Sequence, residues 1–185
     1  QYKGKSLAAY KTVMGAAGAA ALMEEAIALG GRNFVVFGSC GTLNGSSIDA
    51  GGFIVPTAAY RDEGTSYHYM KPSDYVEVET AERTAEILRE LELPFTETKT
   101  WTTDGLYRET LRNMRNRISE GCKVVDMECS AFMAVAQFRG VKVYQYLYAE
   151  DHLDEVQWDP RTLGKVPRSV SGLYLKGALE IALRV

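Results

Sequence analysis

The residues KVVDMECSAFMAVAQFRGVKVYQYLYAEDHLD, from Lys123 to Asp154, decide the fold of this chain. The pattern predicts a short strand, a helix that is apolar on almost all sides, a long strand and then an acidic loop. Asp126 and Glu128 follow the first of these strands, and Glu150 and Asp151 follow the second. In an open α/β sheet, ligands bind in the crevice outside the carboxyl ends of the strands. We therefore expect these four carboxylates to share a binding site.

Strands and helices alternate along the rest of the chain. Apolar or alternating segments predict strands at 7–14, 33–37, 52–60 and 95–103. Helical spacing of apolar residues predicts helices at 16–29, within 73–91, at 107–119, at 128–139 and at 169–183. The alternation predicts an α/β fold with a largely parallel sheet, in one domain over residues 1–185.

The composition excludes several classes of protein. The net charge of -3 gives no basic stripe, so we expect no nucleic-acid partner. The apolar runs are short and interrupted, and no signal peptide is visible, so we expect no membrane partner. The three cysteines lack the spacing of a disulfide framework, which favours a reducing, cytoplasmic compartment. The two histidines lie far apart in the sequence, so no metal site is expected.

Two polar segments follow predicted strands. Gly38–Gly45 is a Gly/Ser loop that either directs backbone N–H groups at an anion or makes a tight turn. Arg61–Ser66 is a dense polar loop, and Tyr67–Met70 beside it either walls a pocket or covers a sheet edge. The chain starts at Gln1 rather than Met, so we expect that an N-terminal part of the protein lies outside it.

Four motifs in one order carry a family resemblance. They are Gly38-Ser-Cys-Gly41 after an apolar strand, Arg61-Asp-Glu-Gly-Thr-Ser66, Asp126-Met-Glu128 at the start of a helix, and Glu150-Asp151 after the next strand. Together they resemble the nucleoside phosphorylase family, which includes hexameric purine nucleoside phosphorylases, uridine phosphorylases and methylthioadenosine nucleosidases. The resemblance covers essentially the whole chain.

The resemblance implies a three-layer αβα sandwich with a central mixed sheet, here without its N-terminal strand and phosphate loop. It implies cleavage of the N-glycosidic bond between ribose and a base. It also implies a homo-oligomer built from dimers, such as a trimer of dimers. No cofactor is expected, because inorganic phosphate acts as the co-substrate.

The resemblance also implies three groups of ligand contacts. Phosphate would meet Gly38 and Ser39, with Arg61 as a further contact. Ribose and base would meet Met14, Leu106, Asp126, Met127 and Glu128. Asp151 would act on the purine.

Elementary chemistry agrees with two of these roles. A carboxylate such as Glu128 accepts two hydrogen bonds from a vicinal diol, which orients the anomeric carbon. A neutral Asp151 donates a proton to the leaving base, and burial beside Glu150 favours that neutral form. The alternative for Glu128 is a helix N-terminal carboxylate stabilised by the macrodipole. The alternative for Glu150 and Asp151 is that they cap a turn.

The sequence departs from the family pattern at the phosphate side of the site. Val36 stands where the phosphorylases carry an arginine, the N-terminal Gly-Asp-Pro-x-Arg loop is not in the chain, and Asp126 replaces a longer Glu. These departures leave open a hydrolytic nucleosidase and a non-catalytic nucleoside-binding relative. Asp151 favours purines over the uridine branch, since Arg112 matches that branch but Thr110 stands where its Gln would be. The leading hypothesis is phosphorolysis of purine nucleosides.

Overall fold

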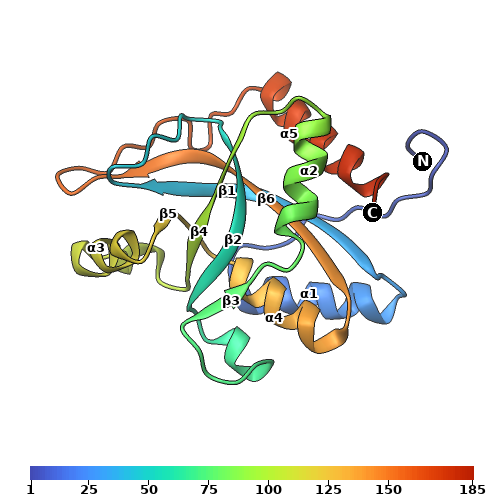
Figure 1. The fold of residues 1–185 in the computed structure, drawn as a ribbon, viewed down its shortest axis with the longest axis horizontal. Helices are drawn as coiled ribbons and strands as arrows, with labels where there is room; N and C mark the ends of the chain where they lie inside the picture. Colours follow the sequence, from blue (N-terminus) through green and yellow to red (C-terminus); the bar gives the residue numbers. More distant parts are fainter.

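A six-stranded sheet organises the protein in the computed structural model, which describes residues 1–185 (Figure 1). The strands are β1 (Asn33–Leu43), β2 (Phe53–Asp62), β3 (Tyr75–Glu77), β4 (Phe95–Thr103), β5 (Cys122–Asp126) and β6 (Lys142–Leu153). The helices are α1 (Ala16–Ala28), α2 (Ala81–Glu90), α3 (Leu111–Ser119), α4 (Cys129–Arg139) and α5 (Arg168–Ala182). Two short 3₁₀ helices, η1 (Thr65–His68) and η2 (Leu106–Arg108), complete the set.

The sheet is mixed and curls until it meets itself. Its strand order is β3-β2-β4-β5-β1-β6, with parallel pairs β1–β6, β2–β4 and β4–β5 and antiparallel pairs β1–β5 and β2–β3. A further antiparallel pairing joins β2 to β6 through Phe53–Tyr148 and Ile54–Leu147. The predicted α/β fold with a central mixed sheet is confirmed, and the β2–β6 pairing closes five of the strands into a ring.

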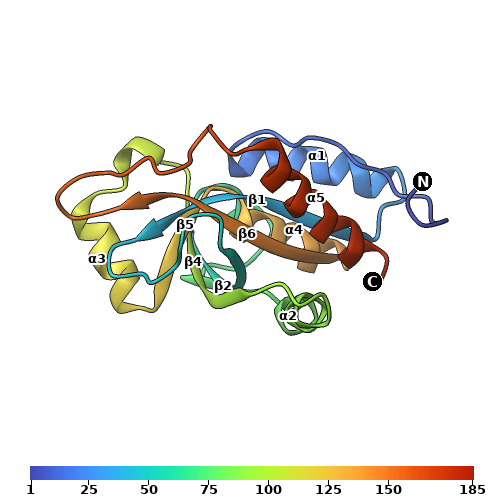
Figure 2. The ribbon, with the colours of Figure 1, turned by 90° about the horizontal axis from the view of Figure 1, so that it is seen from above.

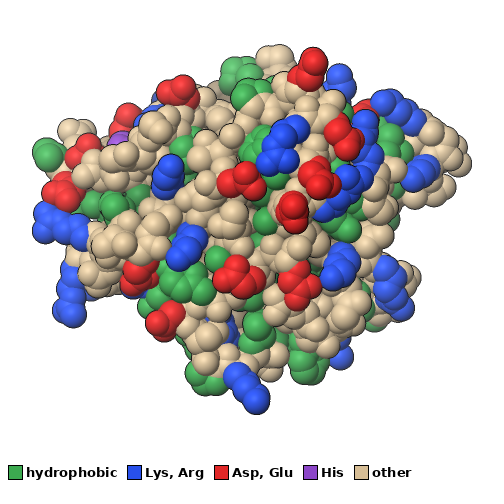
Figure 3. All heavy atoms as spheres, in the orientation of Figure 1, with side chains coloured by type: hydrophobic (Ala, Val, Ile, Leu, Met, Phe, Trp, Pro, Cys, Tyr) green, Lys and Arg blue, Asp and Glu red, His purple; other side chains and the backbone are tan.

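Helices cover both sides of the strands. The helix α1 packs against α4, and α2 packs against α5. The two pairs flank the strands in Figure 1, and Figure 2 shows α1 and α5 on the opposite side of the sheet from α2. Figure 3 shows acidic and basic side chains alternating over the face that carries α2, which fits the solvated charged face predicted for that helix. None of the helices is long and apolar enough to cross a membrane.

The helix α4 is the most deeply buried helix of the fold. Every residue from Cys129 to Ala136 is buried, and most of these side chains are small. Small residues let the helix lie close to β2 and β6 on one side and α1 on the other. The helix ends at Gly140, whose φ of 66° is the left-handed conformation that glycine adopts without strain.

Several predicted elements differ from the observed ones. Residues 7–14 do not form the predicted strand, because no neighbouring strand pairs with them, and Tyr10, Val13 and Met14 are exposed. Gly38–Leu43 is not a loop but the second half of β1, since its backbone pairs with β6 up to Leu153. Likewise Glu150 and Asp151 lie inside β6 rather than in a loop after it. The segment 73–91 divides into β3 and α2.

The burial of α4 gives a stability prediction with an internal control. Phe132 is 3% exposed and Phe138, on the same helix, is 58% exposed. Phe132→Ala should lower the free energy of unfolding by about 3–5 kcal/mol, because it leaves a cavity in the core. Phe138→Ala removes surface contacts with Tyr69 and Arg139 and should cost about 1 kcal/mol or less. Urea denaturation of both variants tests this, and equal losses would contradict the burial of α4.

Candidate functional site

The candidate site lies where three neighbouring strands bring acidic residues together. In the antiparallel pair of β1 and β5, Gly41 faces Val125, so Asp126 at the end of β5 lies beside Cys40. In the parallel pair of β1 and β6, Gly41 faces Asp151. The two predicted acidic groups therefore flank β1 from opposite sides. A Cβ at Gly41 would lie 2.9 Å from Leu153 Cδ1 and 3.1 Å from both Asp151 Oδ1 and Val125 Cγ1, so any larger residue here would displace these side chains.

The residues Asp126, Cys40, Gly41 and Asp151 form a row across β5, β1 and β6. A β-bulge in β6 adds Glu150 to this row. The residue is inserted in β6 opposite the step from Cys40 to Gly41. Such bulges re-aim side chains and are common near active sites. Burial raises the pKa of Glu150, the nearby Ser39 side chain opposes this rise, and the charge of Asp151 adds to it. The bulge thus brings Ser39, Glu150 and Asp151 to one place.

Cys40 lies at the centre of this acidic group. Its side chain is buried, and burial raises the pKa of its thiol well above the usual value. The charges of Asp126, Asp151 and Glu150 raise it further, which shows that all three carboxylates lie within electrostatic reach of one sulfur atom. A thiol in such surroundings stays neutral and unreactive.

Asp126 anchors the start of α4. Its Oδ1 accepts hydrogen bonds from the hydroxyls of Thr100 (2.9 Å) and Thr102 (2.8 Å) on β4. Its Oδ2 accepts from the backbone N–H groups of Glu128 (2.9 Å) and Cys129 (2.6 Å). Burial raises the pKa of Asp126, and these four bonds oppose that rise. They occupy the acceptor positions of a carboxylate, so the base contact expected of Asp126 stays a prediction and would need one of them to open.

Glu128 lies at the N-terminus of α4. Its Oε1 accepts a hydrogen bond of 2.6 Å from the backbone N–H of Gly15, and the backbone N–H of Met127 also stabilises the carboxylate. Burial raises the pKa of Glu128 to about 7, the Gly15 bond opposes the rise, and the charge of Asp126 supports it. Met14, the residue before Gly15, therefore also lies near Glu128, and its side chain is 74% exposed. The hydrogen bond joins two residues that are 113 positions apart in the sequence.

Two residues near Asp151 were not predicted from the sequence. The indole N–H of Trp158 donates to Asp151 Oδ2 at 2.7 Å. Glu109, between η2 and α3, has its pKa raised to about 7 by burial and by the charge of Asp151. The sequence held no signal for either residue, because both reach Asp151 through loops whose course is set by tertiary contacts.

Arg61 is occupied within its own loop. The side chain is 2% exposed, and its guanidinium donates to Ser66 Oγ, the Lys71 carbonyl and Ser73 Oγ, each at 2.8 Å. It also lies 4.1 Å from the centre of the Tyr67 ring. Its Nη2 makes no hydrogen bond. The phosphate contact expected of Arg61 stays a prediction, and it would require the guanidinium to leave these partners.

The rest of the Arg61–Ser66 loop is tied to α4. Glu63 is buried and accepts hydrogen bonds from Ser130 Oγ (2.8 Å) and from the Ser66 backbone N–H (2.9 Å). This polar loop therefore supports the N-terminal turn of α4, which carries Glu128.

The remaining predicted residues are distributed around this row. Gly38 and Met127 are half-buried, Ser39 is exposed, and Leu106 is exposed on η2. No cluster of three or more His, Cys, Asp or Glu side chains is arranged to hold a metal ion.

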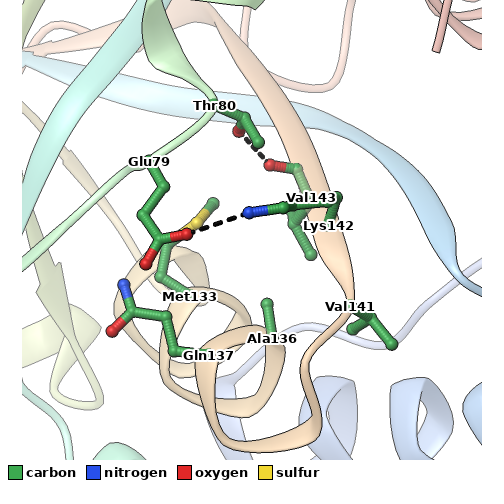
Figure 4. Close-up of a pocket in the computed structure, with 8 residues that line it drawn as sticks. All are labelled: Glu79, Thr80, Met133, Ala136, Gln137, Val141, Lys142 and Val143. Atoms are coloured by element: carbon green, nitrogen blue, oxygen red, sulfur yellow. Dashed lines mark hydrogen bonds and ion pairs between the residues drawn. The ribbon is translucent and has the colours of Figure 1, made fainter.

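Two cavities lie away from the row. The one in Figure 4, about 10 Å³, lies between α4 and the start of β6, and its charged residues Glu79 and Lys142 form an ion pair of 3.1 Å. The other, about 320 Å³, is lined by α5 residues and the N-terminal turn. Neither cavity includes a predicted site residue.

Comparison with known proteins identifies relatives of this chain. The family described as the phosphorylase superfamily matches residues 1–167. A purine nucleoside phosphorylase of Plasmodium vivax (strain Salvador I) is 27% identical over 146 residues, which are 76% of this chain and 59% of that protein. The chain thus spans about three fifths of the length of this relative.

Solved structures share the fold at low sequence identity. The AMP nucleosidase from Bacteroides thetaiotaomicron VPI-5482 matches with a TM-score of 0.73 and 19% identity, over 91% of this chain and 67% of that one. The purine nucleoside phosphorylase from Toxoplasma gondii in complex with immucillin-H matches with a TM-score of 0.75 and 21% identity, over 92% and 68%.

The raised pKa values of Glu109 and Glu128 predict how stability depends on pH. Both side chains have a pKa of about 7 in the folded protein, against 4.5 as the ordinary value. Between pH 5 and 7 the folded protein holds these protons while the unfolded chain has lost them, so the free energy of unfolding should decrease as the pH rises. The pKa of Glu180 is lowered to about 2, so its protonation changes the free energy of unfolding only below pH 5.

Chemical denaturation at pH 5 and pH 7 measures this effect. The double variant Glu109→Gln/Glu128→Gln should show a smaller decrease than the wild type, because neither amide titrates. An unchanged decrease in the double variant would contradict the assignment.

Proposed function

Because the chain belongs to the phosphorylase superfamily, we propose that it cleaves the N-glycosidic bond of purine nucleosides with inorganic phosphate as the second substrate. One observation carries the proposal. Asp126, two residues before Glu128, and Asp151 flank β1 at the neighbouring residues Cys40 and Gly41. A sugar-binding carboxylate and a proton donor are what N-glycosidic cleavage requires.

Each carboxylate has a distinct task in this reaction. Ionised Glu128 accepts hydrogen bonds from the ribose 2′- and 3′-hydroxyls and fixes the anomeric carbon for attack. Met14 and Met127 pack against the sugar. The transition state carries oxocarbenium character, as in other glycoside cleavage. Asp151 gives a proton to the purine as the C–N bond breaks, a general-acid effect of about 10²–10⁴-fold.

The site offers few groups that could bind phosphate. Gly38 and Ser39 offer a backbone and a hydroxyl, but the site also gathers acidic side chains that repel an anion. No arginine stands at Val36, and Arg61 is bound to its own loop. These observations favour one second candidate, a nucleosidase that uses water in place of phosphate. The relatives include both a purine nucleoside phosphorylase and an AMP nucleosidase.

Product analysis distinguishes the candidates. The protein is incubated with inosine, adenosine and uridine, each with and without phosphate. We expect free purine base and ribose 1-phosphate only when phosphate is present, and little release from uridine. Equal base release without phosphate, with free ribose as the product, would replace phosphorolysis by hydrolysis.

A variant separates catalysis from binding. Asp151→Asn should lower the rate of base release by about 10²-fold or more while nucleosides still raise the melting temperature. Thermal stabilisation by nucleosides without base release from the wild type would instead indicate a non-catalytic nucleoside-binding relative. The dimer-based homo-oligomer and the cytoplasmic location stay predictions.

A further inference from the structure

The chain has two tryptophans, and each donates its indole N–H to an aspartate. Trp101 Nε1 donates to Asp62 Oδ2 at 2.9 Å, and Trp158 Nε1 donates to Asp151 Oδ2 at 2.7 Å. Trp101 is fully buried in the sheet core, where its role is packing. Trp158 is 51% exposed, so only about half of its surface is available for packing. It differs from Trp101 in that its hydrogen-bond acceptor is a predicted site residue.

The backbone after β6 holds Trp158 opposite Asp151. The backbone groups of His152 and Asp159 exchange two hydrogen bonds of 2.8 and 2.9 Å, which fold residues 153–158 into a turn over the end of β6. Thr162 N–H then donates to the carbonyl of Glu150 at 3.0 Å. The loop after β6 is thereby hydrogen-bonded to Glu150 and His152, the residues immediately before and after Asp151.

A second contact fixes the tip of this turn. Arg115 on α3 makes a two-pronged ion pair with Glu155, with hydrogen bonds of 2.9 and 2.8 Å. Bidentate Arg–carboxylate pairs fix orientation as well as distance. The turn that carries Trp158 is thus held from β6 and from α3 at once.

We propose that Trp158 is a positioning residue for Asp151: its indole N–H holds one carboxylate oxygen and leaves Oδ1 for the proton that goes to the base. The proposal rests on the proposed function of Asp151. An indole N–H only donates, so the held oxygen always acts as an acceptor.

The surroundings of Asp151 explain why such a donor matters. Glu150 on β6, Glu109 before α3 and Cys40 on β1 interact with it electrostatically, and His152 beside it is bound to Thr42 Oγ1 at 2.7 Å. None of these neighbours donates a hydrogen bond to the Asp151 side chain, whereas the Trp158 indole N–H does. Loss of the N–H should therefore leave the carboxylate free to rotate away from the base.

Steady-state kinetics with inosine test the proposal. A positioning residue acts on the chemical step, so Trp158→Phe, which keeps an aromatic ring without the N–H, should lower kcat by about tenfold and leave KM nearly unchanged. An unchanged kcat would overturn the proposal. Glu155→Gln, which loosens the turn, should lower kcat by less.

A second readout is independent of turnover. The two indole N–H groups give two proton NMR signals, and the Trp158→Phe variant assigns them. The Trp158 signal should move in Asp151→Asn, because an amide replaces the carboxylate that accepts its N–H. The Trp101 signal is the internal control. A Trp158 signal that does not respond to Asp151→Asn would overturn the pairing even if base release occurs, whereas a responsive signal without base release would contradict only the proposed function.

Discussion

The candidate site depends on the four hydrogen bonds of the Asp126 carboxylate. They join two threonines of β4 to the first backbone N–H groups of α4, so one side chain connects sheet and helix. Because α4 is buried on most sides, its N-terminus cannot rely on water to satisfy these donors. The same bonds set the direction in which Glu128 leaves the helix. Asp126 thus decides where the Glu128 carboxylate lies.

Gathering acidic side chains in one row has a thermodynamic cost. Burial raises the pKa of Glu109 and Glu128 to about 7, so the folded protein is less stable at neutral pH than it would be without them. Under the proposed function, Glu128 must be ionised to accept two hydroxyls, and a bound diol would stabilise the ionised form that burial disfavours.

The sequence pattern placed Asp126 with Glu128 and Glu150 with Asp151 near the ends of two predicted strands, and the mixed α/β fold was predicted as well. How these residues approach one another was not predictable, because β5 and β6 run in opposite directions on either side of β1 and reach it at neighbouring residues. The closure of β2 onto β6, the bulge at Glu150 and the extension of β1 to Leu43 were not predictable, because each depends on register between distant strands. Residues 7–14 have the composition of a strand but no neighbour to pair with, so propensity alone gave a wrong prediction.

The central claim is that Glu128 binds the ribose diol. Calorimetric titration of inosine and of 2′,3′-dideoxyinosine in phosphate-free buffer tests it most directly, on the wild type and on Glu128→Gln. Hydrogen bonds to a charged group contribute about 1.5–3 kcal/mol each, so the dideoxynucleoside should bind the wild type about tenfold or more weakly than inosine. The difference should shrink strongly in Glu128→Gln. Equal affinities of the two nucleosides for the wild type would contradict the account.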